Sequence, residues 1–145
     1  MIALIQRVSQ ASVEVDTKII GAINQGLLAL VAVQPGDDET RIQRMCERLL
    51  GYRVFGDEQG KMNLSLQDVA GGLLLVSQFT LAANTNSGKR PCFSRAASPE
   101  QGLRGYNELV RLCRQQHPKV ETGQFGADMK VQLINDGPVT FWLET

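Results

Sequence analysis

A short, purely apolar run from Leu27 to Val33 constrains the fold more than any other feature of this sequence. Gly26 and Pro35 flank it, and such a run between turn residues indicates a central strand that is covered on both faces. The chain before it alternates apolar and polar residues from Ala11 to Asp16, which predicts half-buried antiparallel strands. One layer of structure must therefore lie on each side of the central strand.

Two amphipathic helices can supply one of these layers. The first is predicted from Asp37 to about Gly51, because apolar residues recur at helical spacing after an acidic first turn: Ile42, Met45, Cys46, Leu49 and Leu50. The second begins at the capping box Ser98-Pro99-Glu100-Gln101 and stops at Pro118. Its predicted buried stripe is Leu103, Tyr106, Leu109, Val110 and Cys113. Further strands are expected at 52–55, 73–81, 130–134 and 139–143, giving an α/β domain.

The composition limits the class of protein. A chain of 145 residues, 43% of them hydrophobic, fits one soluble domain spanning 1–145. Cys46, Cys92 and Cys113 lack metal-ligand or disulfide spacing, and no targeting or membrane segment is visible, so we expect reduced thiols and a cytoplasmic location. Fifteen Lys plus Arg balance fifteen Asp plus Glu, so any RNA contact must come from a local patch.

Few side chains suit nucleophilic or acid–base catalysis. His117 is the only histidine, and its place before Pro118 at a predicted helix end favours a structural role, so a histidine-based triad is not indicated. Two segments remain where polar residues interrupt apolar strands, Ser77 to Leu81 and Asn135 to Thr140. From the residues alone, the first can be a strand leaving the core and the second a reverse turn joining two strands.

Five motifs in order carry a resemblance that extends over nearly the whole chain. They are Gln6-Arg7-Val8 with Ala11 and Val13, Gly60-Lys61-Met62-Asn63-Leu64, Ser77-Gln78-Phe79-Thr80-Leu81, Phe125-Gly126-Ala127-Asp128-Met129, and Asn135-Asp136-Gly137-Pro138-Val139-Thr140. On these motifs the sequence resembles the D-aminoacyl-tRNA deacylase family. One departure is Cys92, where the family usually has a serine, which puts a hydrogen bond from that hydroxyl in doubt but not the activity.

The resemblance implies a fold and a site. The fold has layered, partly barrel-like β-sheets with two main amphipathic helices packed on the outside. The chain is expected to form a homodimer with active sites at the subunit interface, where Ser77, Gln78, Phe79 and Thr80 of one subunit are catalytic. A cis Gly137–Pro138 peptide enters from the other subunit as a chiral gate. Further contacts with substrate or tRNA are expected from Arg7, Met129, Lys89 and Arg90.

The implied reaction is hydrolysis of the ester of D-aminoacyl-tRNA, and of mischarged glycyl-tRNA, without a cofactor or metal. L-aminoacyl substrates are rejected because the gate leaves no room for an L side chain. Water is the expected nucleophile, assisted by the substrate's ribose hydroxyl, with backbone N–H groups around Gln78 and Phe79 as the oxyanion hole. Thr80 is expected to position groups rather than attack. Two other classes stay open: an RNA-binding module without catalysis, and a structural homodimer.

Overall fold

The computed structural model describes residues 1–86, 88–94 and 96–145. Its regular elements are β1 (Ile2–Val15), β2 (Lys18–Ile23), β3 (Gly26–Ala32), α1 (Glu39–Gly51), β4 (Phe55–Gly56), β5 (Met62–Leu64), β6 (Gly72–Ser77), the 3-10 helix η1 (Phe79–Ala82), α2 (Pro99–Gln116), β7 (Val120–Thr122) and β8 (Lys130–Glu144). None of the helices formed by these residues is long and apolar enough to cross a membrane.

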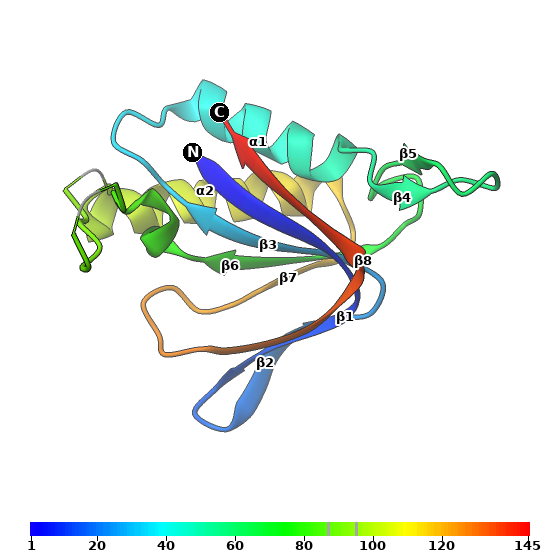
Figure 1. The fold of residues 1–145 in the computed structure, drawn as a ribbon, viewed down its shortest axis with the longest axis horizontal. Coiled ribbons are helices and arrows are strands. Elements are labelled where there is room, and N and C mark those ends of the chain that lie inside the picture. Colours follow the sequence, from blue (N-terminus) through cyan, green and yellow to red (C-terminus); the bar gives the residue numbers. More distant parts are fainter. Residues whose placement is uncertain (87, 95) are drawn as a thin grey trace.

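The larger sheet is built around β1. This long strand pairs antiparallel with β2, β3 and β8, as the alternating sequence predicted. Strands β6 and β7 then extend the sheet from β3 in parallel, giving the order β2-β1-β3-β6-β7 with β8 beside β1. The short strands β4 and β5 form a separate hairpin that projects from one end of the molecule (Figure 1).

The central strand is confirmed as β3, and it is covered on both faces. Leu27, Ala29 and Val31 point into a core shared with both helices. Leu28, from the opposite face, packs in a second core with Val8 and the far halves of β1, β2 and β8. Figure 1 shows α1 and α2 on one side of the sheet, while β2 and the ends of β1 and β8 curl under the other side. The expected layered, partly barrel-like arrangement is therefore present.

Both predicted helices form, and the capping box predicted for the second is present. The side chain of Asp38 accepts a hydrogen bond at the start of α1, and Ser98 forms the complete capping box with Gln101 at the start of α2. The predicted buried stripe of α2 is wrong at Leu103, which is 42% exposed. Gly105 is buried in its place: a Cβ there would lie 3.1 Å from the Val33 side chain, so glycine lets the helix approach the sheet.

Three strand predictions need correction. Of the strand expected at 52–55, only Phe55 lies in a strand, β4. The strand expected at 73–81 ends at Ser77, because Gln78 leaves the extended conformation (φ −145°, ψ 73°) and a 3-10 helix follows. The strands expected at 130–134 and 139–143 are halves of one strand, β8, and both pair with β1. The segment between them is therefore not a reverse turn that pairs two strands with each other.

Candidate active site

The first part of the candidate site is the end of β6, formed by Ser77, Gln78, Phe79 and Thr80. The strand is buried up to Val76, after which Ser77 and Gln78 are half-buried and Phe79 and Thr80 are exposed. The chain leaves the sheet here because Gln78 N–H makes the last bond to β3, donating to the Val31 carbonyl at 2.7 Å. The polar residues that interrupt the apolar run thus lie where the core opens to solvent.

Two backbone donors at the β6 end have no acceptor among the residues that the structure describes. The Gln78 N–H is already bonded to Val31, so it does not serve as one of the expected oxyanion donors in this conformation. The N–H groups of Phe79 and Thr80 open η1, and no acceptor among the described residues receives either of them. The Gln78 side chain instead donates from Nε2 to Thr80 Oγ1 at 2.5 Å. Adjacent free N–H groups of this kind are suited to hold a developing negative charge.

The loop after η1 packs back onto the β6 end. The Phe93 ring lies 5.1 Å from that of Phe79, and paired backbone bonds between Asn84 and Cys92 close the loop. Lys89 and Arg90 lie within it, exposed and without a hydrogen bond or ion pair to any described residue. Of the basic residues in this loop, Arg95 falls outside the described residues.

Met129 also lies near the β6 end. It packs against the second core, which contains Val76, the residue before Ser77. Its sulfur accepts a bond from the Gln124 N–H at 3.4 Å, which fixes the chain after β7. The third and fourth motifs of the sequence therefore meet on one side of the molecule.

The second part of the site is a protrusion from β8, formed by Asp136, Gly137, Pro138 and Val139. Gln6 of β1 pairs with Thr140, yet Val8 pairs with Asn135, so β8 carries three residues more than β1 over this interval (140 − 135 against 8 − 6). These extra residues bulge out of the sheet, and Asp136, Gly137 and Pro138 are exposed. The Gly137–Pro138 peptide is cis, as expected.

Asn135 closes the neck of the protrusion. Its Oδ1 accepts a bond from the Val139 N–H at 2.7 Å, and its Nδ2 donates to Thr140 Oγ1 at 2.8 Å. One side chain thus replaces the ladder bonds that the register slip removes. The sequence prediction gave Asn135 no role of its own, although the residue stands in the fifth motif.

Arg7 holds the protrusion from its other side. Its Nε donates to the Asp136 carbonyl oxygen at 2.8 Å and its Nη1 donates to the Val54 carbonyl oxygen at 2.6 Å. A guanidinium can make both bonds at once because its donors form a rigid fork. A pocket opens beside this contact and is lined by Arg7, Gln25, Phe55, Gly56, Gly60, Met62, Asp136 and Val139. The first, second and fifth motifs therefore meet here.

The two parts of the site do not meet within one chain. Ser77 is in register with Val31, Val31 with Ala3, and Ala3 with Leu143, so β6 and β8 are three strand spacings apart. Arg7 lies four residues further along β1 than Ala3. With strand spacings of about 4.8 Å and a rise of about 3.3 Å per residue, the protrusion is about 20 Å from Ser77. Figure 1 likewise places the β6 end and the β4–β5 hairpin at opposite ends of the sheet.

His117 is placed away from the β6 end. It ends α2, is 5% exposed, and its Nε2 lies 2.7 Å from the Gly71 carbonyl oxygen, just before the start of β6. Ser77 stands at the other end of that strand. The predicted structural role of His117 therefore agrees with its position, and a base for Ser77 or Thr80 does not come from it.

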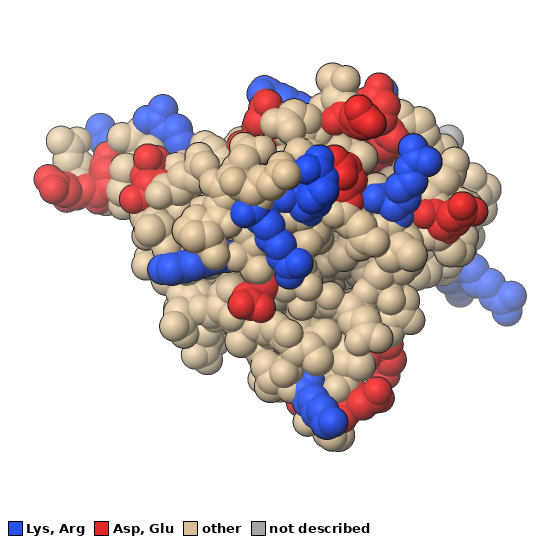
Figure 2. All heavy atoms as spheres, turned by 180° about the vertical axis from the view of Figure 1, so that it is seen from behind, with Lys and Arg blue, Asp and Glu red and all other residues tan. Residues whose placement is uncertain are grey.

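Charge is distributed as the balanced composition predicts. On the face opposite to that of Figure 1, basic and acidic side chains are interspersed and uncharged surface predominates (Figure 2). Among the described residues, no group of three His, Cys, Asp or Glu side chains is placed to hold a metal ion.

Comparisons with known proteins agree over the full chain. The family model described as D-Tyr-tRNA(Tyr) deacylase matches residues 4–144. The chain is 65% identical over 144 residues to a D-aminoacyl-tRNA deacylase of Stenotrophomonas maltophilia, with 99% of each protein covered. It is 60% identical over 145 residues to a D-aminoacyl-tRNA deacylase of Pectobacterium carotovorum, with 100% of each covered.

Two solved structures share the fold. One, described as c-Myc DNA Unwinding Element Binding Protein, superposes with a TM-score of 0.96 at 38% identity, covering 100% of this chain and 99% of that one. The other, described as a probable eukaryotic D-amino acid tRNA deacylase, has a TM-score of 0.85 at 16% identity, covering 99% and 98%. The second likeness concerns the fold alone, and it confirms the predicted fold class.

Proposed function

The chain belongs to the D-Tyr-tRNA(Tyr) deacylase family, and from that membership we propose that it hydrolyses D-aminoacyl-tRNA at a site shared between two copies of the chain. It is accordingly a hydrolase that deacylates D-aminoacyl-tRNA, and the further proposal concerns how it does so. The observation that carries the shared site is the separation of about 20 Å between the β6 end and the β8 protrusion. Both are exposed, so a second copy can bring its protrusion to the β6 end of the first.

The β6 end supplies the chemistry in this proposal. Water attacks the ester carbonyl carbon, the oxyanion forms hydrogen bonds with the free N–H groups of Phe79 and Thr80, and the ribose oxygen leaves with a proton. The substrate's own neighbouring ribose hydroxyl assists the proton transfer, since His117 is too distant to act. One such donor typically contributes about 2.7–4 kcal/mol to transition-state stabilisation, and an aminoacyl ester needs less help than an amide.

Thr80 positions groups rather than attacking. Its hydroxyl accepts a bond from the Gln78 side chain at 2.5 Å, and no base among the described residues is placed to activate it. Thr80→Ala should therefore retain substantial turnover. A complete loss of turnover in a folded Thr80→Ala protein would contradict the water mechanism.

The β8 protrusion supplies chirality in this proposal. Gly137 and Pro138 of the partner copy present backbone carbonyls to the substrate amino group and occupy the space where an L side chain would project. D side chains point away from this surface, so many D-amino acids are accepted. Glycine has no side chain to reject, so glycyl-tRNA is also hydrolysed. Lys89 and Arg90, which have no partners in the described structure, contact tRNA phosphates.

Release of amino acid from D-tyrosyl-tRNA and L-tyrosyl-tRNA tests the reaction. The proposal expects rapid release of the D-amino acid only. Binding of tRNA without release of either amino acid would favour the alternative of a nucleic-acid-binding module. One solved structure with this fold is described as a DNA unwinding element binding protein.

Mixed dimers test whether the site is shared. We expect Thr80→Trp, which fills the β6 end, and Gly137→Ala, which distorts the protrusion, to be inactive separately. Co-refolding them in equal amounts should make half of the dimers mixed, each with one intact site, and so restore about one quarter of wild-type activity. If both parts acted within one chain, co-refolding would restore nothing. A wild-type protein that leaves D-tyrosyl-tRNA intact would instead contradict the reaction itself.

A further inference from the structure

Two cysteines outside the candidate active site meet where α1 packs against α2. The sulfur atoms of Cys46 and Cys113 are 3.5 Å apart, and both residues are 0% exposed. A disulfide has a sulfur–sulfur length of about 2.05 Å, so the thiols need to approach by about 1.5 Å, which small side-chain rotations can supply. Neither cysteine takes part in the proposed reaction.

The two thiols differ in their surroundings. Cys46 sulfur accepts hydrogen bonds from the Cys113 thiol and from the Gln116 side-chain amide at 3.6 Å. The bond from Cys113 lowers the pKa of Cys46, against the opposing effects of burial and of Glu47. The same bond and burial raise the pKa of Cys113. Cys46 is therefore the more acidic thiol of the pair, and Cys113 is the thiol that donates to it.

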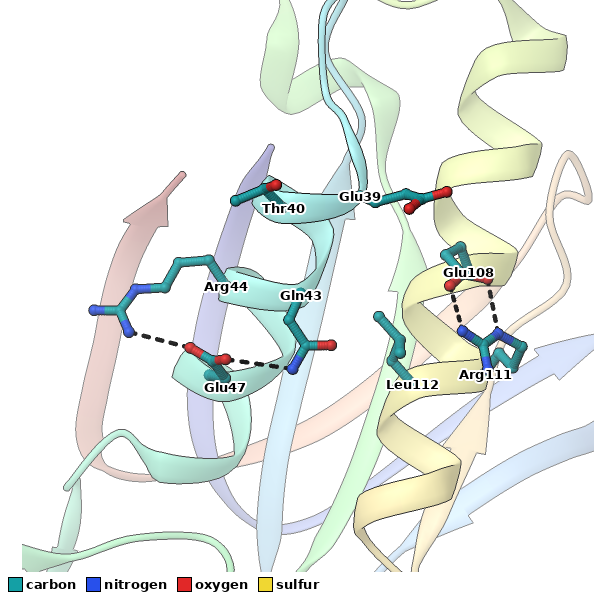
Figure 3. Close-up of a pocket in the computed structure, with 8 residues that line it drawn as sticks. All are labelled: Glu39, Thr40, Gln43, Arg44, Glu47, Glu108, Arg111 and Leu112. Atoms are coloured by element: carbon teal, nitrogen blue, oxygen red, sulfur yellow. Dashed lines mark hydrogen bonds and ion pairs between the residues drawn. The ribbon is translucent and has the colours of Figure 1, made fainter.

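The buried Cys46 sulfur lies beside a side chain that reaches solvent. Gln116, whose amide contacts it, is an exposed residue at the end of α2. A groove also runs along the outside of the two helices, lined in part by Gln43 and Glu47 of α1 and Leu112 of α2 (Figure 3). These residues are close neighbours in sequence of the two cysteines. Oxidation of the sulfur would require the exposed Gln116 side chain to rotate away from it.

We propose that Cys46 and Cys113 form a site of oxidative modification, at which a peroxide joins α1 to α2 through a disulfide. The Cys46 thiolate attacks one oxygen of hydrogen peroxide, the O–O bond breaks, and hydroxide leaves, giving a sulfenic acid on Cys46. The Cys113 sulfur then attacks the Cys46 sulfur; the S–O bond breaks and the hydroxyl leaves as water with the Cys113 proton. In sum, two thiols and one peroxide give a disulfide and two waters.

The consequence for the fold is a covalent clamp around the segment that holds the β6 end. The bond would close a loop from Cys46 to Cys113, which contains β4, β5, β6 and η1. Both cysteines lie in the core on the helix side of the sheet, away from the exposed β6 end. Oxidation should therefore raise the Tm while leaving the β6 end unblocked.

The experiment uses the full-length Cys92→Ser protein, which removes the exposed third thiol and leaves only the pair. The folded protein is treated with hydrogen peroxide, quenched, and analysed by mass spectrometry after unfolding in an alkylating agent. We expect a loss of two hydrogen atoms, no alkylation of Cys46 or Cys113, and a higher Tm that reductant reverses. Thiols that stay fully alkylatable, at peroxide doses that oxidise Cys92 in the unsubstituted protein, would overturn the proposal.

Two further variants test the assigned order of reaction. In the same background, Cys113→Ala should leave a sulfenic acid on Cys46 that dimedone traps, whereas Cys46→Ala should leave Cys113 unlabelled. Dimedone labelling of Cys113 in folded Cys46→Ala, as strong as labelling of Cys46 in Cys113→Ala, would show that the assigned order of reaction is wrong. The mass measurement on Cys92→Ser stands even if these variants fold poorly.

Discussion

Replacement of Arg7 by methionine tests how the β8 protrusion is held. The change keeps an unbranched side chain of similar reach but removes the donors to the carbonyl oxygens of Asp136 and Val54. These two losses have different consequences. Val54 is 1% exposed, so its carbonyl loses a partner that water replaces poorly. Asp136 is exposed, so water can replace the bond but cannot fix the direction of the protrusion.

The expected cost in stability is modest. A buried acceptor left without a donor costs about 1–3 kcal/mol. For a domain of this size the Tm falls by about 2–4 °C for each kcal/mol, so Arg7→Met should still be folded at 25 °C. The expected cost in activity is larger, because a displacement of about 1 Å in a positioning group can lower the rate about 100-fold. The activity of Arg7→Lys should lie between those of the wild type and Arg7→Met, since one ammonium cannot make the forked contact.

The assay compares kcat/KM for D-tyrosyl-tRNA with Tm from thermal denaturation. Arg53→Met is the matched control, because Arg53 also donates to a carbonyl oxygen, that of Asn63 at 2.7 Å, but is not bonded to the protrusion. We expect the control to keep its activity. The reasoning is refuted if Arg7→Met shows the expected decrease in Tm and yet deacylates at the wild-type rate. The protrusion would then keep its direction without the arginine.

Three other predictions concern separate parts of the molecule. In Gly137→Ala the new Cβ would lie 2.7 Å from the backbone nitrogen two residues along, at a φ of +153° that suits glycine, so deacylation should be lost while circular dichroism stays native. Lys89→Gln with Arg90→Gln should reduce the slope of log affinity for tRNA against log salt by about 1.4–1.8; an unchanged slope would exclude these contacts. Asp68 accepts two bonds from Ser65, which lower its pKa below the unfolded value, so its stabilisation is present above about pH 4 and is lost as pH falls through the folded pKa. The Tm difference between the wild type and Asp68→Asn should therefore shrink below about pH 4, and a constant difference would contradict this.

The sequence predicts those parts of the fold that depend on local patterns. The run from Leu27 to Val33 required cover on both faces, and the structure supplies helices on one side and curled strands on the other. The capping box at Ser98 fixed the start of α2 to the residue. Leu103 was misplaced because Gly105, which has no side chain, faces the sheet in α2. Helical periodicity is read from side chains, so it does not register a face formed by glycine.

The shape of the β8 protrusion could not be predicted from its own residues, because it depends on how β8 pairs with β1. A polar, glycine- and proline-containing segment between two apolar runs looks the same whether it is a hairpin turn or a bulge. What decides between them is that both runs pair with β1, at registers that differ by three residues. Asn135 then stabilises the slip by bonding to Val139 and Thr140. The family resemblance predicted the cis peptide, whereas the bulge follows only from the register between β1 and β8.

The same separation explains why the sequence contains no recognisable pairing of a nucleophile with its base. Motifs three and four gather at the β6 end, while motifs one, two and five gather around Arg7 and the protrusion, about 20 Å away by strand spacing. On the proposed function, neither half alone contains a nucleophile with its base; one offers the N–H groups of Phe79 and Thr80 and the other offers the peptide of Gly137 and Pro138. Backbone groups carry no sequence signature of their own. Their chemistry depends on which chain conformation exposes them, and on a second copy being close enough to complete the site.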